Sequence, residues 1–104
     1  MTASLGALAS LVRSKNAGPF WITIDILLPD SACFDRVSRS RITDARAIAE
    51  LYGVDARHVK VFLLAELLAI KISFPRPVTQ GSLHDRDMHA GQQYVPLLDI
   101  PVGD

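Results

Sequence analysis

The strongest constraint on the fold is the stretch "FWITIDILLP", residues 20–29, in which buried and exposed positions alternate with a period of two. Such alternation is typical of a strand that buries one face. The apolar face would carry Phe20, Ile22, Ile24, Ile26 and Leu28. The opposite face would carry Trp21, Thr23, Asp25 and Leu27, with the carboxylate of Asp25 marking the exposed side because an unpaired buried charge is costly. The sequence therefore predicts a half-buried strand that ends at Pro29.

Two short helices are predicted to follow this strand. Asp30 or Ser31 can cap the first, which would carry Phe34 on its apolar face. The second helix is "TDARAIAELYG", with Thr43 as its predicted N-cap and Gly53 at the position after its last turn. These capping residues place the boundaries of both helices.

The segment 59–74 fits two different structures. Its apolar spacing matches one long helix, whereas "VKVFLL" and "AIKISF" are rich in β-branched and aromatic residues. We favour two antiparallel strands with a tight connection at 65–68, the second of them stopped by Pro75 and Pro77. Residues 5–12 fit either a helix or a strand that leads into a loop, "RSKNAGP".

The chain becomes polar after Pro77. The stretch "VTQGSLHDRDMHAGQQ", residues 78–93, has no apolar period and predicts a long loop, which in a compact domain is commonly functional. "YVPLLDIPV", residues 94–102, is predicted to be extended and to return to the sheet or to pack on a partner. Together these elements predict one α+β domain over residues 1–104.

Composition excludes several classes of protein. A chain of 104 residues, 49% of them hydrophobic, can bury a core without disulfides or metals. Eleven basic residues balance eleven acidic ones, so no positive field for nucleic acid is expected. The longest apolar run falls short of the about 20 residues that cross a bilayer, so no membrane is expected. The single cysteine, Cys33, and the absence of a signal sequence predict a cytoplasmic protein.

Two histidines and two aspartates lie close together within "SLHDRDMHAGQQ" and suggest a metal site at first sight. His84, Asp85, Asp87 and His89 have suitable ligand atoms, but the histidines are not at the i, i+4 spacing of a helical metal site. The favoured interpretation is a polar loop in which the aspartates cap turns and pair with Arg86. We therefore expect neither a metal nor another cofactor.

A second polar cluster, "RSKNAGPF", could hold a carboxylate or phosphate. Arg13 and Lys15 would contact the anion, Asn16 would donate or accept, and Gly18 would allow close backbone approach. The alternative is a basic turn in which Asn16 and Gly18 adopt positive φ. Arg76, held between two prolines at the end of a predicted strand, is well placed to bind a carboxylate. The alternative is an ordinary exposed arginine at the end of a strand.

Cys33 has no histidine near it in the sequence, and a nucleophilic thiol needs a base or a cationic environment. A buried, inert thiol in the first helix is the favoured interpretation.

The chain also resembles a known family over almost its whole length. The segments "RSKNAGPFWITIDI", "LYGV", "AIKISFPRPVTQGS" and "DRDMHAGQQYVPLLDI" are similar to a small bacterial family named as a domain of unknown function, number 4387. Members resemble partners of acyclic terpene utilisation A (AtuA-like) proteins, encoded beside them or fused to them. The resemblance implies a ferredoxin-like two-layer sandwich, with a mainly antiparallel sheet, two short helices and a long C-terminal polar loop.

The resemblance also implies which residues matter. The small domain at the end of the AtuA-like proteins has a loop similar to "RSKNAG", which implies comparable roles for Arg13, Ser14 and Lys15. The positions that match the family pattern are Asn16, Gly18, Asp25, Arg76, Pro77, Gly81, Ser82, Asp85, Asp87, Gln92 and Gln93. His84 and His89 lie outside it, which argues further against a histidine metal site.

Two functions of different classes follow from these observations. In the first, the chain is a small subunit that completes a hydratase, lyase or isomerase site with a larger AtuA-like protein and acts on a carboxylate or CoA thioester. Lys15, Asp85 and Asp87 would then be catalytic. The residues expected to bind the substrate are Arg13, Ser14, Asn16, Gly18, Arg76, Gln92 and Gln93. In the second, the chain is a noncatalytic module that assembles with itself or with a partner.

Overall fold

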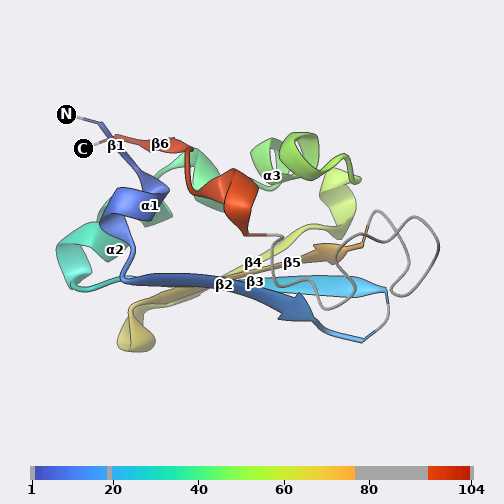
Figure 1. The fold of residues 1–104 in the computed structure, drawn as a ribbon, viewed down its shortest axis with the longest axis horizontal. Coiled ribbons are helices and arrows are strands. Elements are labelled where there is room, and N and C mark those ends of the chain that lie inside the picture. The colour runs from blue at the N-terminus through green and yellow to red at the C-terminus, as the bar shows by residue number, and fades with distance from the viewer. Residues whose placement is uncertain (1, 19, 77–93, 104) are drawn as a thin grey trace.

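An antiparallel sheet covered on one face is the centre of the protein in the computed structural model (Figure 1). The structure describes residues 2–18, 20–76 and 94–103. Four strands form the main sheet in the order β2-β3-β5-β4: β2 (Leu11–Asn16), β3 (Trp21–Leu27), β5 (Ala69–Pro75) and β4 (Lys60–Leu64). A second, two-stranded sheet joins the two ends of the chain, β1 (Ala3–Ser4) and β6 (Pro101–Val102).

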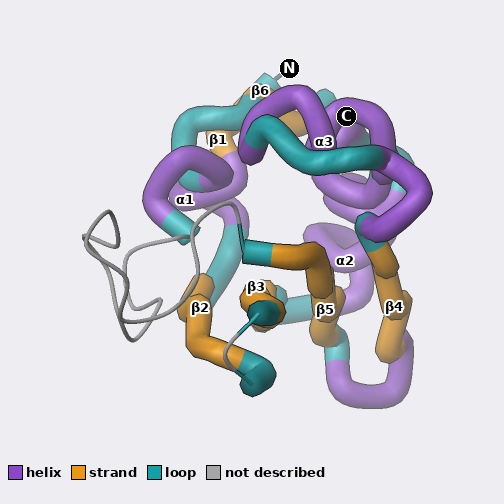
Figure 2. The backbone as a smooth tube through the Cα atoms, turned by 90° about the vertical axis from the view of Figure 1, so that its right-hand side faces the viewer, coloured by secondary structure: helices purple, strands orange, loops and turns teal. Residues whose placement is uncertain are grey.

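Short helices connect and cover these strands. The α-helices are α1 (Leu5–Leu8), α2 (Ser31–Ser38) and α3 (Ala45–Tyr52). The 3-10 helices are η1 (Arg41–Thr43), η2 (Ala56–His58), η3 (Ala65–Leu67) and η4 (Val95–Leu97). Figure 2 shows α1 and α3 on one side of the sheet, and the opposite side, which we call the open face, is not covered by a described helix. None of the described helices is long and apolar enough to span a membrane.

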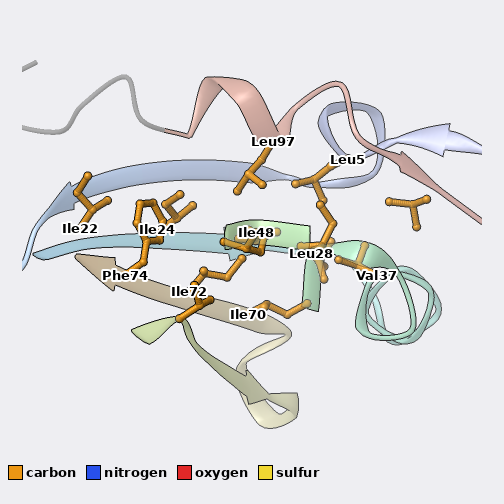
Figure 3. Close-up of a cluster of buried hydrophobic side chains, with 14 of the residues drawn as sticks. Leu5, Ile22, Ile24, Leu28, Val37, Ile48, Ile70, Ile72, Phe74 and Leu97 are labelled. Carbon is orange, nitrogen blue, oxygen red and sulfur yellow. The ribbon is translucent and has the colours of Figure 1, made fainter. Parts of the chain in front are cut away.

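The core lies between the sheet and the helices (Figure 3). The alternation predicted from the sequence places three isoleucines of β3 in it, and the register sets each opposite an apolar residue of β5. These pairs are Ile22 with Phe74, Ile24 with Ile72, and Ile26 with Ile70. All six side chains are fully buried, and such cross-strand apolar pairs are the main stabilising contacts within a sheet. Leu5, Val37, Ile48 and Leu97 close the core from the helical side.

Phe20 departs from the predicted alternation. The strand begins at Trp21, so Phe20 lies in the turn between β2 and β3 and is 60% exposed. Its backbone still takes part in the sheet, because its carbonyl accepts a hydrogen bond from the Arg76 N–H at 2.8 Å. The prediction that Phe20 faces the core is therefore wrong.

Capping residues fix the ends of α2 and α3. The predicted cap at Asp30 is confirmed, since its carboxylate accepts a hydrogen bond from the Cys33 N–H at 2.8 Å. The predicted cap at Thr43 is wrong: Asp44 caps α3, and its carboxylate accepts from the Arg46 N–H at 3.0 Å. Thr43 belongs instead to η1, and its hydroxyl donates to the carbonyl of Ser38, in the last turn of α2.

Gly53 ends α3 as predicted. It adopts the left-handed conformation with φ of 69°, which glycine occupies without a steric penalty. The last turn of α3 packs on β5, where the rings of Tyr52 and Phe74 lie with their centroids 4.4 Å apart. Burial raises the pKa of the Tyr52 hydroxyl above its usual range.

The segment 59–74 forms the predicted hairpin and not a helix. β4 and β5 pair from Lys60 opposite Ser73 to Leu64 opposite Ala69, and η3 makes the connection. Leu68 completes this turn in the left-handed conformation with φ of 50°. The β-branched and aromatic residues of the two strands therefore outweigh their helical spacing.

Three predicted segments, at residues 5–12, 13–19 and 94–102, differ in secondary structure from the prediction. Residues 5–12 contain both alternatives, because α1 ends at Leu8 and β2 begins at Leu11. The predicted loop at 13–19 is mostly strand, since β2 continues to Asn16. Residues 94–102 are not extended throughout: they form η4 and then pair through β6 with β1 instead of joining the main sheet.

The predicted α+β class with a mainly antiparallel sheet is confirmed. β3 and β4 pair antiparallel with opposite sides of β5, so they run parallel to each other with β5 between them. Their connection passes through α2 and α3, which gives the split β-α-β unit found in ferredoxin-like folds. The fourth strand of the sheet, β2, precedes this unit in the chain and pairs with β3 through a tight hairpin.

Candidate functional site

The polar residues of β2 separate onto the two faces of the sheet. Ser14 and Asn16 lie on the helical side, and Ser14 is paired with the buried Ile24. Arg13 and Lys15 lie on the open face, because successive side chains of a strand point to opposite sides. One sequence motif therefore contributes to two separate surfaces.

On the helical side, Asn16 and Arg76 meet at the end of the sheet where β2 and β5 finish. Nη1 of Arg76 donates a hydrogen bond to Oδ1 of Asn16, and both residues are half-buried. The backbone of Arg76 is fixed by its bond to Phe20 and by Pro75 before it. Asn16 orients the guanidinium through its amide oxygen, and a guanidinium is the side-chain group that best matches a carboxylate or phosphate.

Ser14 joins the same strand to the C-terminal part of the chain. Its side chain is 9% exposed, and its Oγ accepts a hydrogen bond from the Tyr94 N–H at 3.1 Å. Arg76 and Tyr94 are the described residues on either side of the segment 77–93, so both flanks of this segment are attached to β2. The segment itself lies outside the described residues, and with it lie His84, Asp85, Asp87, His89, Gln92 and Gln93.

On the open face, charged side chains form a row across three strands. Nε of Arg13 lies 3.6 Å from Oδ2 of Asp25, and the register places Lys71 on the other side of Asp25. The Asp25 side chain is only 17% exposed, so the predicted exposed carboxylate is in fact partly covered and paired. Asp25 offsets the charge of Arg13, which makes Arg13 a weaker anion ligand than an arginine beside an amide.

A shallow hollow lies next to this row on the open face. It has a volume of about 260 Å³ and is lined by Ala17, Trp21, Lys60, Phe62 and Ser73. Nζ of Lys60 lies 5.5 Å from the centre of the Trp21 ring, within the range of a cation–π interaction. The hollow thus combines an aromatic wall with a positive charge.

The structure does not support one anion site made by Arg13, Lys15 and Arg76. Asn16 is the residue of "RSKN" that contacts Arg76, while the two cations of the motif lie on the opposite face. Gly18 lies in the β2–β3 turn with φ of 84°, and nothing described is within 4 Å of the position that a Cβ would take. Gly18 forms the turn, as the alternative interpretation proposed. The positive φ that this interpretation gave to Asn16 is wrong, because Asn16 is the last residue of β2.

The described residues contain no group of metal ligands, and their cysteine, Cys33, does not have the surroundings of a nucleophile. Cys33 is half-buried, and partial desolvation together with the nearby Asp30 carboxylate raises the pKa of its thiol, which disfavours a nucleophile. Among residues 2–18, 20–76 and 94–103, no three His, Cys, Asp or Glu side chains are grouped closely enough to hold a metal ion.

Comparison with known protein families identifies the family of this chain. The family model described as "Domain of unknown function (DUF4387)" matches residues 5–101. No curated protein and no solved structure matches the chain. The matched range includes every strand of the main sheet and the residues Ser14, Asn16 and Arg76.

Proposed function

The chain belongs to the DUF4387 family, and from this membership we propose that it is a small accessory subunit that completes a site with a larger AtuA-like protein in the cytoplasm. The reaction class is a hydration, elimination or isomerisation of an organic acid or CoA thioester. The observation that carries the proposal is the contact between Asn16 and Arg76, which lie 60 residues apart in sequence. This contact joins the two polar motifs at one end of the sheet.

The chemistry of the contact suits a carboxylate ligand. Arg76 presents a planar guanidinium with several N–H donors, and such a fork matches the two oxygens of a carboxylate. Its position is set by the sheet, because its N–H bonds to Phe20 and its side chain bonds to Asn16. In the proposed site Arg76 binds the substrate carboxylate, while Asp85 or Asp87 orients the substrate or transfers a proton.

In the proposed complex, a larger partner encloses the site at Arg76. Sites for small organic ligands are commonly concave and enclose most of the ligand surface. Four hollows on the described surface have volumes of about 260–320 Å³, and none of these four is lined by Ser14, Asn16 or Arg76. A site that is built on one edge of a small sheet would be enclosed by a second protein that covers it.

A noncatalytic assembly module is the second candidate function. A group of exposed apolar side chains on β4 and η3 favours it: Phe62, Leu63, Leu64 and Leu67. This group lies on the edge of the sheet opposite β2, so assembly through it and binding at Arg76 are separable properties. The two candidates therefore predict different effects of substitutions at the two places.

The proposed complex is tested by coexpression with the larger AtuA-like protein that the proposal expects at the same locus. We expect a tag on the larger protein to retain this chain through size-exclusion chromatography at a fixed ratio. A matched control uses an AtuA-like protein from an unrelated gene neighbourhood, which should retain much less. Failure of the two neighbouring proteins to copurify, with no change in any activity of the larger one, would contradict the proposed function.

A further inference from the structure

The exposed apolar side chains of the described chain are concentrated on one edge of the main sheet. Phe62, Leu63 and Leu64 of β4 are 45%, 52% and 38% exposed, and Leu67 of η3 is 70% exposed. β4 is the last strand in the order β2-β3-β5-β4, so no other described strand lies beside its outer side. Exposed apolar side chains that are concentrated in this way commonly mark a contact with another protein.

The two edges of the sheet differ in how they are protected. β2 carries Arg13 and Lys15, and charged side chains on an edge strand discourage pairing with another chain. β4 has no charge between Lys60 and Leu64 and contains no proline. An edge strand that is apolar on both faces and has free backbone groups is suited to pair with a further strand.

The hydrogen bonds of β5 show which backbone groups of β4 face outward. The Arg76 N–H donates to the Phe20 carbonyl, and the Leu28 N–H donates to the Leu68 carbonyl. Because backbone groups of successive residues point to opposite sides of a strand, the even-numbered residues of β5 bond to β3 and the odd-numbered residues bond to β4.

The register then identifies the outward groups. Opposite the odd-numbered residues of β5 lie Lys60, Phe62 and Leu64 of β4, which are therefore the residues bonded to β5. The N–H and C=O groups of Val61 and Leu63 point away from β5, toward the free edge. These two residues flank Phe62 symmetrically, which is the arrangement needed for pairing of β4 with a copy of itself.

We propose that two copies of this chain pair antiparallel through β4 about a two-fold axis beside Phe62, which joins their main sheets into one. Val61 of one copy exchanges both backbone hydrogen bonds with Leu63 of the other, and the reverse pair repeats them. The two Phe62 residues form the pair without hydrogen bonds at the axis, where side chains on the open face approach most closely. Self-pairing of one surface by a two-fold axis is the commonest form of oligomer.

The charges at the two ends of β4 also favour this orientation. Lys60 lies at the start of the strand, and Glu66 follows its end. Antiparallel pairing brings the cationic end of one copy beside Glu66 of the other, whereas parallel pairing would place like charges together. Both ends of the interface therefore have complementary charges, and this favours a second copy as the occupant of the edge.

Oppositely charged variants at Phe62 test the dimer in two ways, by its loss in each variant and by its recovery when the two variants are mixed. By sedimentation equilibrium we expect the wild-type chain to have twice the mass of one copy. Phe62→Lys and Phe62→Glu should each be monomeric, because each places two like charges at the axis, and mixing the two variants should restore the doubled mass. Phe20→Lys, at another exposed phenylalanine away from β4, should leave the mass doubled.

Leu63→Pro provides a second variant that keeps the hairpin. It removes an outward N–H and no bond to β5, so it should halve the mass while circular dichroism stays unchanged. A monomeric wild-type chain, a dimeric Phe62→Lys variant or a mixture that does not re-form the dimer would overturn the proposal. The proposal would also be overturned if β4 paired with the larger AtuA-like protein and not with a second copy of this chain. None of these results bears on the function proposed at Arg76, which is tested by copurification and turnover.

Discussion

Replacing Phe74 by alanine is expected to lower the free energy of unfolding by about 3–5 kcal/mol, the usual cost of truncating a buried phenylalanine. Phe74 is fully buried, pairs with Ile22 across the sheet and contacts the ring of Tyr52. The variant loses these contacts and leaves a cavity where α3 rests on β5. Because domains are commonly stable by only about 5–15 kcal/mol, this change should remove a large part of the total.

Urea unfolding followed by circular dichroism measures this effect. Phe20→Ala is the matched control, because it removes the same atoms from a side chain that is 60% exposed, and it should change the free energy of unfolding by less than about 1 kcal/mol. Equal losses in the two variants would show that the packing of β5 against α3 does not stabilise the protein as described.

Replacing Arg76 by alanine is expected to lower the turnover of the proposed complex with an AtuA-like protein by about 10- to 100-fold, since a hydrogen bond to a charged group contributes about 1.5–3 kcal/mol. Arg76→Lys should recover part of the loss, because lysine keeps the charge but lacks the planar fork. Copurification should persist in both variants. Arg39→Ala removes an exposed arginine from the end of α2, and it should leave turnover unchanged.

The same variants separate binding from assembly. Circular dichroism and the mass of the complex show whether loss of the bond between Arg76 and Asn16 affects folding. An Arg76→Ala complex that assembles and turns over at the wild-type rate would contradict a role in substrate binding. Loss of assembly with unchanged turnover per complex would place Arg76 in an interface and favour the assembly module.

The sequence predicts the strands and helices whose side chains have one clear periodicity. Residues 20–28 alternate in the sequence, and Asp30 and Gly53 are strong capping residues, so β3, the start of α2 and the end of α3 follow from local chemistry. β2 was not predicted, because it has no apolar face. Its inner face carries the polar Ser14 and Asn16, and its outer face carries the charged Arg13 and Lys15. The sequence of a strand that is polar on both sides has no apolar periodicity and therefore predicts a loop.

The N-terminal cap of α3 could not be predicted from local sequence for a different reason. Thr43 and Asp44 are both good capping residues, and local preference does not choose between them. The choice depends on η1, which uses the Thr43 hydroxyl to bind the end of α2 and leaves Asp44 to cap α3. Such competition between neighbours is decided by tertiary structure.

The candidate site could be predicted only in part. Arg76 and Asn16 stand out by residue type, but their contact depends on the pairing of β2 and β5 with opposite sides of β3. Once residues 11–16 are recognised as a strand, the period of two separates Asn16 from Arg13 and Lys15. The missing information was therefore the secondary structure of one short segment.

Reconstitution of turnover from separately purified proteins is the most direct test of the shared site. The larger AtuA-like protein is held at a fixed concentration with a panel of carboxylates and CoA thioesters, and this chain is added in increasing amounts. We expect turnover of at least one compound to rise until the two proteins are equimolar, and to rise far less with Arg76→Ala. Turnover by the larger protein that does not depend on this chain would contradict the proposed function.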